Sequence, residues 1–354
     1  MRVTLTASRR PLATSYDVAL LDLDGVVYVG TDAVPGAPDA LAKAREAGMR
    51  LAFVTNNAAR PPGAVAEHLR SLSISADPGE VVTSSQAAAH YLADRLPSGA
   101  KVLVVGTTGL IEALRERGLE PVSSADDEPA AVVQGYSPKL DWQQLAEGAV
   151  AIRAGALWVA TNLDPTVPSP RGPLPGNGSL VAALRHATGV TPVATGKPDP
   201  TMHRESVQRS HAESPIVVGD RLDTDIEGAA AVGCASLLVL SGVTSARELL
   251  AAVPEHRPDY LAPTVAGLLS AHPAVEAAGG RARCGRWVVE VDRQTLTVTA
   301  LEASEGDSND GLDPLRALCT AAWTAAGRPG EGTDWQVRAT GEAAQDAVSR
   351  LELD

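Results

Sequence analysis

Two carboxylates one residue apart, Asp22 and Asp24, directly follow the apolar run 18–21. Four consecutive apolar residues bounded by polar ones predict a strand buried on both faces, as in a parallel sheet covered by helices. Side chains two residues apart in a strand point to the same side, so both carboxylates would share one small space where the strand ends. Two anions held there repel each other unless a cation or a proton lies between them. The pair therefore predicts a metal site, with an ordinary polar turn as the alternative that this motif alone leaves open.

Three further polar clusters follow three further apolar runs. Residues 50–54 lead into 55–57, residues 191–194 into 195–198, and residues 214–218 into 219–225. In an open α/β sheet, ligands bind outside the carboxyl ends of the strands. We therefore expect all four clusters to converge on one site of a doubly wound, Rossmann-like parallel sheet.

These residues resemble the four motifs of the haloacid dehalogenase superfamily. The motifs are Asp-Leu-Asp-Gly at 22–25, Thr-Asn-Asn at 55–57, Lys197, and Gly-Asp at 219–220 with Asp225. Residues 160–165, 170–172 and 175–180 are similar to its subfamily IIA, which has a large C2-type cap after the second motif. That subfamily contains NagD-like nucleotide, pyridoxal, phosphoglycolate and glycerol 3-phosphate phosphatases. The resemblance covers about residues 14 to 270 and implies phosphate ester hydrolysis through an aspartyl-phosphate.

The chemistry of phosphoryl transfer assigns roles to the two carboxylates. The reaction needs an in-line nucleophile, a cation on the phosphoryl oxygens, further positive charge, and an acid for the leaving oxygen. We expect Asp22 to attack phosphorus, because a carboxylate nucleophile splits one hard displacement into two easier ones. Asp24 would protonate the departing alkoxide and later take a proton from the attacking water. Ion-pumping ATPases of the superfamily have threonine at the position of Asp24, so the resemblance implies rapid hydrolysis here.

Asp220 adds a third carboxylate at the end of its strand. With the side chain of Asp22 and the backbone carbonyl of Asp24 it makes an all-oxygen shell, which suits Mg²⁺. Zinc is disfavoured, because none of the seven histidines is spaced as a ligand pair and the three cysteines are far apart. Asp225 precedes an expected helix from residue 226, as either its N-cap or a group that reaches the metal through water.

Phosphate binding is expected from the second and third clusters. Lys197 would act as a point charge on phosphate, Thr55 offers a hydroxyl, and Asn56 offers a backbone amide. Asn57 is a secondary candidate. Three residues of the proline-rich segment either contact the substrate and set specificity or only stabilise their loop through Asx hydrogen bonds: Asn162, Asp164 and Arg171.

The 354 residues are enough for two or three domains. We predict a core from 1–83 and 190–270, an α/β cap from 84–189, and a small α+β module from 271–354. Residues 277–281 read as a linker, and a helix is expected to begin at Leu180. The ββαβα pattern of the terminal module is similar to part of an acetyltransferase fold. Because the glycine-rich pyrophosphate loop is not evident, we expect a structural or subunit-contact role.

Charge and composition limit the partners. The formal charge of −13 argues against nucleic acid, whose phosphates need basic patches. No apolar run approaches the ~20 residues of a membrane span, and residues 1–6 lack a signal-peptide core. Three widely spaced cysteines indicate reduced thiols in a cytoplasmic protein. The oligomeric state stays open, a homo-oligomer included.

The sequence therefore predicts a Mg²⁺-dependent phosphatase acting on a small phosphorylated metabolite. The match most resembles the glycerol 3-phosphate phosphatases, with 2-phosphoglycolate and pyridoxal 5'-phosphate as alternative substrates. Two other classes stay open: a phosphotransferase or mutase, and a non-catalytic regulatory protein that works through its terminal module.

Overall fold

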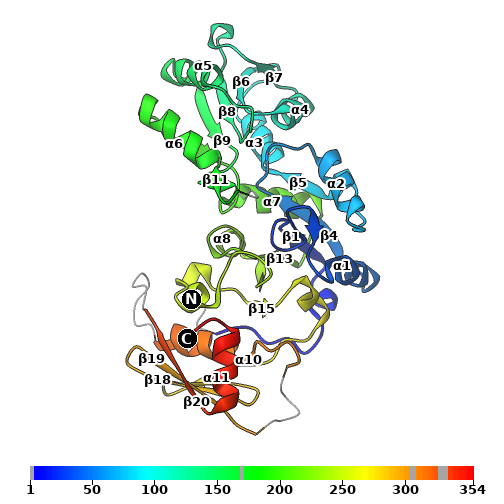
Figure 1. Cartoon of the computed structure of the whole chain (residues 1–354). Helices are drawn as coiled ribbons and strands as arrows, with labels where there is room; N and C mark the ends of the chain where they lie inside the picture. The colour runs from blue at the N-terminus through cyan, green and yellow to red at the C-terminus, as the bar shows by residue number, and fades with distance from the viewer. Residues whose placement is uncertain (1–3, 168–170, 303–307, 326–333) are drawn as a thin grey trace. The chain divides into compact units, whose positions relative to one another are not determined.

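The computed structural model describes residues 4–167, 171–302, 308–325 and 334–354, and these form two compact units (Figure 1). The first unit combines the chain up to Leu51 with Ala212–Asp354, and the second comprises Ala52–His211. Both contain parallel strands covered by helices, which confirms the predicted α/β fold. Among the residues that the structure describes, no helix combines the length and apolar character that a bilayer span requires.

A parallel sheet organises the first unit. Four of its strands are consecutive neighbours, in the order β15 (Tyr260–Ala262), β14 (Ala235–Val239), β13 (Pro215–Gly219) and β1 (Val18–Leu21). Every residue of β1 is buried, as expected for a strand covered on both faces. Strand β4 (Arg50–Thr55) begins in this unit, where the Arg50 amide donates to the oxygen of Asp17 over 2.9 Å. The two motif aspartates, Asp22 and Asp220, thus follow adjacent strands.

Short elements complete this part of the first unit. They are η1 (Leu12–Thr14), the hairpin β2 (Tyr28–Val29) and β3 (Asp32–Ala33), α1 (Ala37–Glu46), the π-helical turn η4 (Leu222–Ile226), α8 (Glu227–Val232), α9 (Ala246–Leu250), η5 (Pro254–His256) and η6 (Val265–Leu269).

The terminal module is a five-stranded sheet with two helices. Its strand order is β16 (Glu276–Ala278), β17 (Arg281–Cys284), β18 (Trp287–Asp292), β19 (Thr295–Ala300) and β20 (Gln336–Thr340), and its helices are α10 (Asp313–Ala325) and α11 (Glu342–Arg350). Only β19 and β20 pair in parallel. The predicted ββαβα order is present from β18 onward. The acidic loop expected over 305–313 lies partly outside the described residues.

The linker predicted over 277–281 is wrong, because these residues belong to a β-hairpin. Ala278 pairs with Arg281 across the turn, and the two residues between them, Gly279 and Gly280, have φ of 58° and 77°. Two positive φ values in a two-residue connection are typical of the type I′ turn, which matches the twist of paired strands. The glycines therefore close a hairpin instead of separating two domains.

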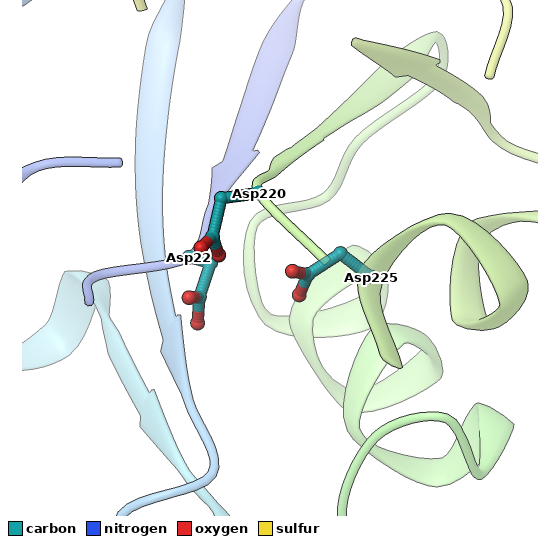
Figure 2. Close-up of side chains that lie close together, drawn as sticks. All are labelled: Asp22, Asp220 and Asp225. Atoms are coloured by element: carbon teal, nitrogen blue, oxygen red, sulfur yellow. The ribbon is translucent and has the colours of Figure 1, made fainter. Parts of the chain in front are cut away.

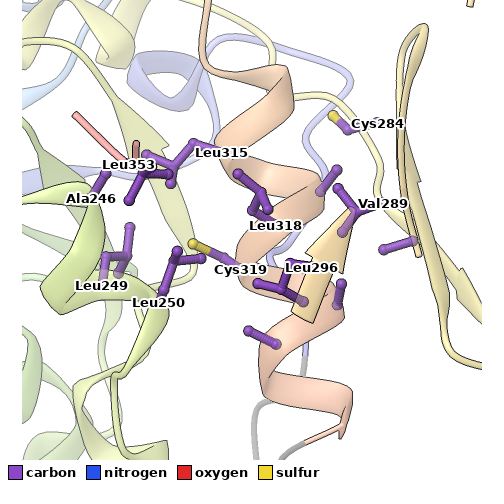
Figure 3. Packing of buried hydrophobic residues seen from close by; sticks show 14 of the residues in the cluster. Ala246, Leu249, Leu250, Cys284, Val289, Leu296, Leu315, Leu318, Cys319 and Leu353 are labelled. Carbon is purple, nitrogen blue, oxygen red and sulfur yellow. The ribbon is translucent and has the colours of Figure 1, made fainter. Parts of the chain in front are cut away.

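One hydrophobic core joins the terminal module to the parallel sheet (Figure 3). Leu249 and Leu250 of α9 lie on one side of α10, and Val289 of β18 and Leu296 of β19 lie on the other. Helix α10 is thus buried on both sides, and Cys319 in it is fully buried. Each large apolar side chain buried in this way contributes about 1.5–3 kcal/mol, so the module and the parallel sheet form one cooperative unit.

The second unit contains the predicted cap sheet. Five parallel strands lie in the order β12 (Val193–Ala194), β9 (Leu157–Ala160), β8 (Ala131–Gln134), β6 (Lys101–Val105) and β7 (Glu120–Val122). The other elements are α2 (Pro62–Ser71), η2 (Pro78–Glu80), β5 (Val81–Thr83), α3 (Ser84–Ala93), α4 (Thr108–Glu116), η3 (Ala125–Asp127), α5 (Trp142–Arg153), the hairpin β10 (Thr166–Val167) and β11 (Leu174–Pro175), α6 (Asn177–Thr188) and α7 (Pro200–Arg209).

Two details of this unit differ from the expectations. The strand before Thr195 pairs with β9 of the cap sheet, although it was assigned to the core. Helix α6 begins at Asn177 and not at Leu180, because the glycine at 178 lets the first turn approach residue 163, where a Cβ would lie 2.2 Å from the main-chain oxygen. The domain boundaries at 83, 190 and 270 stay a prediction.

Candidate active site

Three carboxylates from distant parts of the sequence meet in the first unit (Figure 2). Asp22 follows β1, Asp220 follows β13, and these strands are paired with Leu21 opposite Val218. Asp225 comes from the π-helical turn η4. One ligand oxygen from each of the three lies within 4.8 Å of the others. Three carboxylate oxygens this close repel one another and make a donor set that suits a hard divalent cation.

Close backbone packing holds the Asp220 side chain in place. The amide of Val243 donates to its Oδ2 over 2.7 Å, and the Thr244 hydroxyl donates to its main-chain oxygen over 2.6 Å. A Cβ on Gly25 or Gly242 would lie 2.4 or 1.9 Å from the same Oδ2. Gly25 also has a φ of +84°, a conformation that residues with a Cβ rarely adopt. The glycine after Asp24 is therefore required both by the turn and by the carboxylate beside it.

Asp225 belongs to the carboxylate group and does not cap a helix. Helix α8 begins at Glu227 without a side-chain cap, so the N-cap interpretation is wrong. The Asp225 Oδ2 instead accepts from the amide of Arg221 over 3.2 Å, and residue 225 is 1% exposed. The wide π-turn explains this placement, since such turns interrupt α-helical geometry and are frequent at functional sites. Asp223, expected to be solvated, is exposed and bonds to Arg221 over 2.8 Å.

Asp24 lies apart from the group of three. Its side chain is exposed, and Leu23 before it is buried. The residue forms an isolated bridge with Tyr28, and the next amide, that of Gly25, donates to the Tyr28 oxygen over 2.8 Å. An exposed carboxylate at the edge of a tight turn can exchange protons with a ligand or with water. The metal-binding role predicted for the Asp24 carbonyl stays a prediction.

In the second unit, Asn56 is the centre of a polar network. Its Nδ2 donates to Asp164 Oδ2 and to the Lys197 main-chain oxygen, both over 3.2 Å, and its Oδ1 accepts from the Lys197 amide over 2.8 Å. Its main-chain oxygen accepts from Ser84 over 2.6 Å and from Asn162 over 2.8 Å. The structure therefore brings together the segments after β4, β9 and β12. The side chain of Asn56 bonds to other protein groups, so the phosphate contact proposed for this residue is left to its backbone amide.

Lys197 is 4% exposed, and its Nζ donates to the main-chain oxygen of Val54 over 3.3 Å. Burial and the neighbouring Lys197 charge lower the pKa of His203 in α7 to about 3, so its imidazole is neutral at physiological pH. Both ring nitrogens of His203 are buried and make no hydrogen bond within the described residues.

The other predicted residues are distributed as follows. Thr55 is buried, and its hydroxyl accepts from the Asn57 amide over 3.1 Å. Asn57 is exposed, and its side chain accepts from the Ala59 amide over 2.8 Å. Arg171 is exposed. Two residues of the Asn56 network, Ser84 and Asn177, escaped sequence reasoning, because a single buried Ser or Asn has no distinctive pattern.

Comparisons with known proteins agree with this geometry. A family model described as haloacid dehalogenase-like hydrolase matches residues 19–120, and a related model of HAD-hydrolase-like proteins matches 194–268. A model of a GCN5-related N-acetyltransferase-like domain matches residues 284–353, in line with the fold likeness noted for the terminal module.

Two characterised relatives are similar over much of their length. A D-glycerol 3-phosphate phosphatase of Mycobacterium tuberculosis is 44% identical over 97% of this chain and 96% of its own. An acid sugar phosphatase of Staphylococcus aureus is 37% identical over 66% of this chain and 90% of its own.

Solved structures extend the likeness to the fold. A glycerol phosphate phosphatase from Mycobacterium tuberculosis in complex with magnesium is 44% identical, covers 98% of this chain and 100% of its own, and has a TM-score of 0.87. A p-nitrophenyl phosphatase from Archaeoglobus fulgidus is 32% identical, covers 72% and 98%, and has a TM-score of 0.67.

The fold and the carboxylate group define a hydrolase with a Rossmann-like core and an inserted cap. The chain belongs to the haloacid dehalogenase superfamily of hydrolases, as its motifs indicated.

Proposed function

We propose that the protein is a Mg²⁺-dependent phosphatase that hydrolyses glycerol 3-phosphate to glycerol and phosphate. The observation that carries this proposal is the group of three carboxylates, Asp22, Asp220 and Asp225, whose oxygens lie within 4.8 Å of one another. The 44% identity to a D-glycerol 3-phosphate phosphatase over almost the whole of both chains supports the substrate. The relative that was solved with magnesium supports the choice of metal.

Mg²⁺ fits the donor set, because it prefers carboxylate oxygens and keeps several waters. Asp220 and Asp225 would hold it together with one oxygen of Asp22 and the carbonyl of Asp24. When bound, the ion neutralises charge on the phosphoryl oxygens and between the carboxylates.

The reaction follows from the carboxylates on either side of Leu23. A carboxylate oxygen of Asp22 attacks phosphorus, and the bond between phosphorus and the glycerol oxygen breaks while Asp24 gives that oxygen a proton. Water then attacks the aspartyl-phosphate, Asp24 takes a proton from it, and phosphate leaves with Asp22 restored. The exposed position of Asp24 supports its role as the group that exchanges protons.

Thr55, the amide of Asn56 and Lys197 would bind the phosphoryl group, with Asn57 as a secondary contact and Arg171 as a contact to the leaving alcohol. A buried lysine near-excluded from water acts strongly on an anion, because charges interact more strongly away from bulk solvent. The low exposure of Lys197 supports this role. The division into core, cap and terminal module is part of the same proposal, with a structural role for the module.

A panel of phosphate monoesters tests the proposal. Glycerol 3-phosphate, 2-phosphoglycolate, pyridoxal 5'-phosphate and a sugar phosphate are assayed with Mg²⁺ and with EDTA, using wild type and Asp22→Asn. We expect glycerol 3-phosphate to have the highest kcat/KM, with activity lost in EDTA and in the variant. Preference for another ester would correct the substrate, and phosphate release only with an added acceptor would identify a phosphotransferase. No turnover of any ester by wild type would favour a regulatory protein.

The cytoplasmic location expected from the sequence is also proposed. Three cysteines are buried as free thiols, Cys234, Cys284 and Cys319, and burial raises the pKa of each. Such thiols are unreactive, as suits a reducing compartment.

A further inference from the structure

We propose that Asp164 and Asn162 are positioning residues, which act through Asn56 on the loop that carries Lys197, and that neither sets the choice of leaving alcohol. This inference rests on the proposed phosphatase function. It replaces the expectation that both residues contact the substrate, and it adds Asn56 as the connecting group. All these residues belong to the second unit.

The amide of Asn56 has one orientation that satisfies its neighbours. A carboxylate only accepts and a main-chain N–H only donates, so Nδ2 faces Asp164 and Oδ1 faces the amide of Lys197, at 3.2 and 2.8 Å. Nδ2 also donates to the Lys197 oxygen. The side chain thus grips both main-chain polar groups of Lys197, in the way that a neighbouring strand would. Loss of the Asp164 carboxylate removes the partner that draws Nδ2 to this side.

Asn162 fixes the same loop from its other end. Its Nδ2 donates to the Asn56 oxygen over 2.8 Å, and its Oδ1 accepts from the Asp164 amide over 3.2 Å. Asn162 is 4% exposed. Every side-chain polar atom of Asn162 is therefore bonded to the loops that flank it. A residue engaged in this way holds its neighbours in register.

The backbone packing of these loops leaves no slack. A Cβ on Gly196 would lie 2.2 Å from the Thr161 oxygen and 2.8 Å from Asn56 Oδ1. On the far side, a Cβ on Gly176 would lie 2.4 Å from the Asp164 oxygen, and Asn177 donates to the Asn162 oxygen over 2.8 Å. Because three loops meet without space, a change at Asp164 is transmitted to the backbone of Lys197.

The two roles for Asp164 predict different substrate dependences. Lys197 acts on the phosphoryl group, which all phosphate monoesters share. If Asp164 positions Lys197, its removal lowers kcat/KM by one common factor for every ester. If Asp164 touches the alcohol, the loss varies with the alcohol, and inorganic phosphate, which has none, binds unchanged.

The first experiment compares wild type, Asp164→Ala and the exposed control Asp126→Ala. We expect Asp164→Ala to lower kcat/KM by about 10- to 100-fold, the loss typical of slight misplacement, and equally for glycerol 3-phosphate, 2-phosphoglycolate and p-nitrophenyl phosphate. Calorimetry should show weaker binding of inorganic phosphate in the presence of Mg²⁺, and Asp126→Ala should match wild type. A loss that differs more than tenfold between esters, or unchanged phosphate affinity, would overturn the inference.

A rescue experiment tests the contact between the two side chains. Asn56→Asp places two carboxylates together, and Asp164→Asn added to it restores a donor and an acceptor with their positions exchanged. We expect the double variant to bind inorganic phosphate more tightly than Asn56→Asp alone, and Asp164→Asn alone to be milder than Asp164→Ala. Losses that simply multiply would contradict the contact. Circular dichroism identifies variants that fail to fold, and the isosteric Asp164→Asn then decides.

The phosphate-binding measurement also separates this inference from the proposed function. Wild type that binds inorganic phosphate but hydrolyses no ester would refute the phosphatase activity alone. Active wild type whose Asp164 variants change only the ranking of esters would refute the positioning role alone.

Discussion

The guanidinium of Arg316 donates a hydrogen bond to the main-chain oxygen of Leu261, 2.7 Å away. Arg316 lies on α10 of the terminal module and Leu261 on β15 of the parallel sheet. Arg316 is only 2% exposed, and its Nη1 also donates to Asp310 over 2.8 Å and to Asp313 over 2.9 Å. A buried charge is tolerated where each of its donors has such a partner. The bond thus anchors the module to the sheet at a defined place.

Arg316→Leu should destabilise the first unit strongly. The substitution leaves two carboxylates without their cation, and breaking a buried ion pair from one side costs about 3–5 kcal/mol. Equilibrium unfolding in urea measures the loss. Arg338→Ala changes an exposed arginine of the same module and should stay within about 0.5 kcal/mol of wild type. A loss for Arg316→Leu no larger than that of the control would contradict the anchoring role.

Asp310 should make stability depend on pH in the acid range. Burial alone would raise the pKa of its carboxyl, but the hydrogen bonds and charge of Arg316 override this and lower the pKa from 3.8 to about 2. A carboxyl with a depressed folded-state pKa stabilises the fold above its unfolded pKa, and this contribution disappears as the pH falls from about 4 to about 2.

Asp310→Asn should therefore be less stable than wild type at pH 7 by about 2 kcal/mol, and the difference should vanish near pH 2. Urea unfolding at a series of pH values measures this, with the exposed Asp346→Asn as the control. A constant difference across the whole range would show that the charge of Asp310 is not responsible.

The sequence predicted those parts of the site that depend on local pattern. A buried apolar run followed by Asp22, and another followed by Asp220, placed both carboxylates at strand ends, because burial and strand termination are visible in adjacent residues. The role of Asp225 was left open, since its position depends on a π-helical turn that no propensity signals. The network around Asn56 depends on three loops that meet only in the folded chain.

The errors in the fold have the same origin. Strand β16 has three exposed residues, so it lacks the alternation of apolar and polar residues that reveals a half-buried strand. Gly279 and Gly280 were then interpreted as a linker. For β12, the sequence gave no means to choose between two parallel sheets, because an edge strand of two residues carries no information about its partner.

Asp225 and Asp223 provide a matched pair for the metal proposal. Both belong to the same turn, but Asp225 lies in the carboxylate group and Asp223 is exposed. Asp225→Asn removes one charge from the group, so the Mg²⁺ concentration for half-maximal activity should rise about 10- to 100-fold. Asp223→Asn should leave it unchanged. A Mg²⁺ titration of phosphatase activity measures both, and an equal effect of the two variants would assign the change to the turn instead.

His203 should reduce stability at mildly acidic pH. Burial and the charge of Lys197 lower its pKa from 6.5 to about 3, so the unfolded chain binds a proton that the folded chain excludes. The folded state is therefore favoured above pH 6.5, and stability falls as the pH drops below that value. His203→Leu should remove this dependence.

At pH 5 the variant should gain about 2 kcal/mol relative to its own difference from wild type at pH 8. An apolar side chain is tolerated here, because both ring nitrogens lack hydrogen bonds within the described residues and replacement of an unsatisfied polar group by an apolar one is nearly neutral. Unfolding in urea at both pH values measures the gain, and the exposed His186→Gln should show none. A profile for His203→Leu parallel to that of wild type would mean that the imidazole is protonated in the folded chain, with an anion beside it that offsets the charge of Lys197.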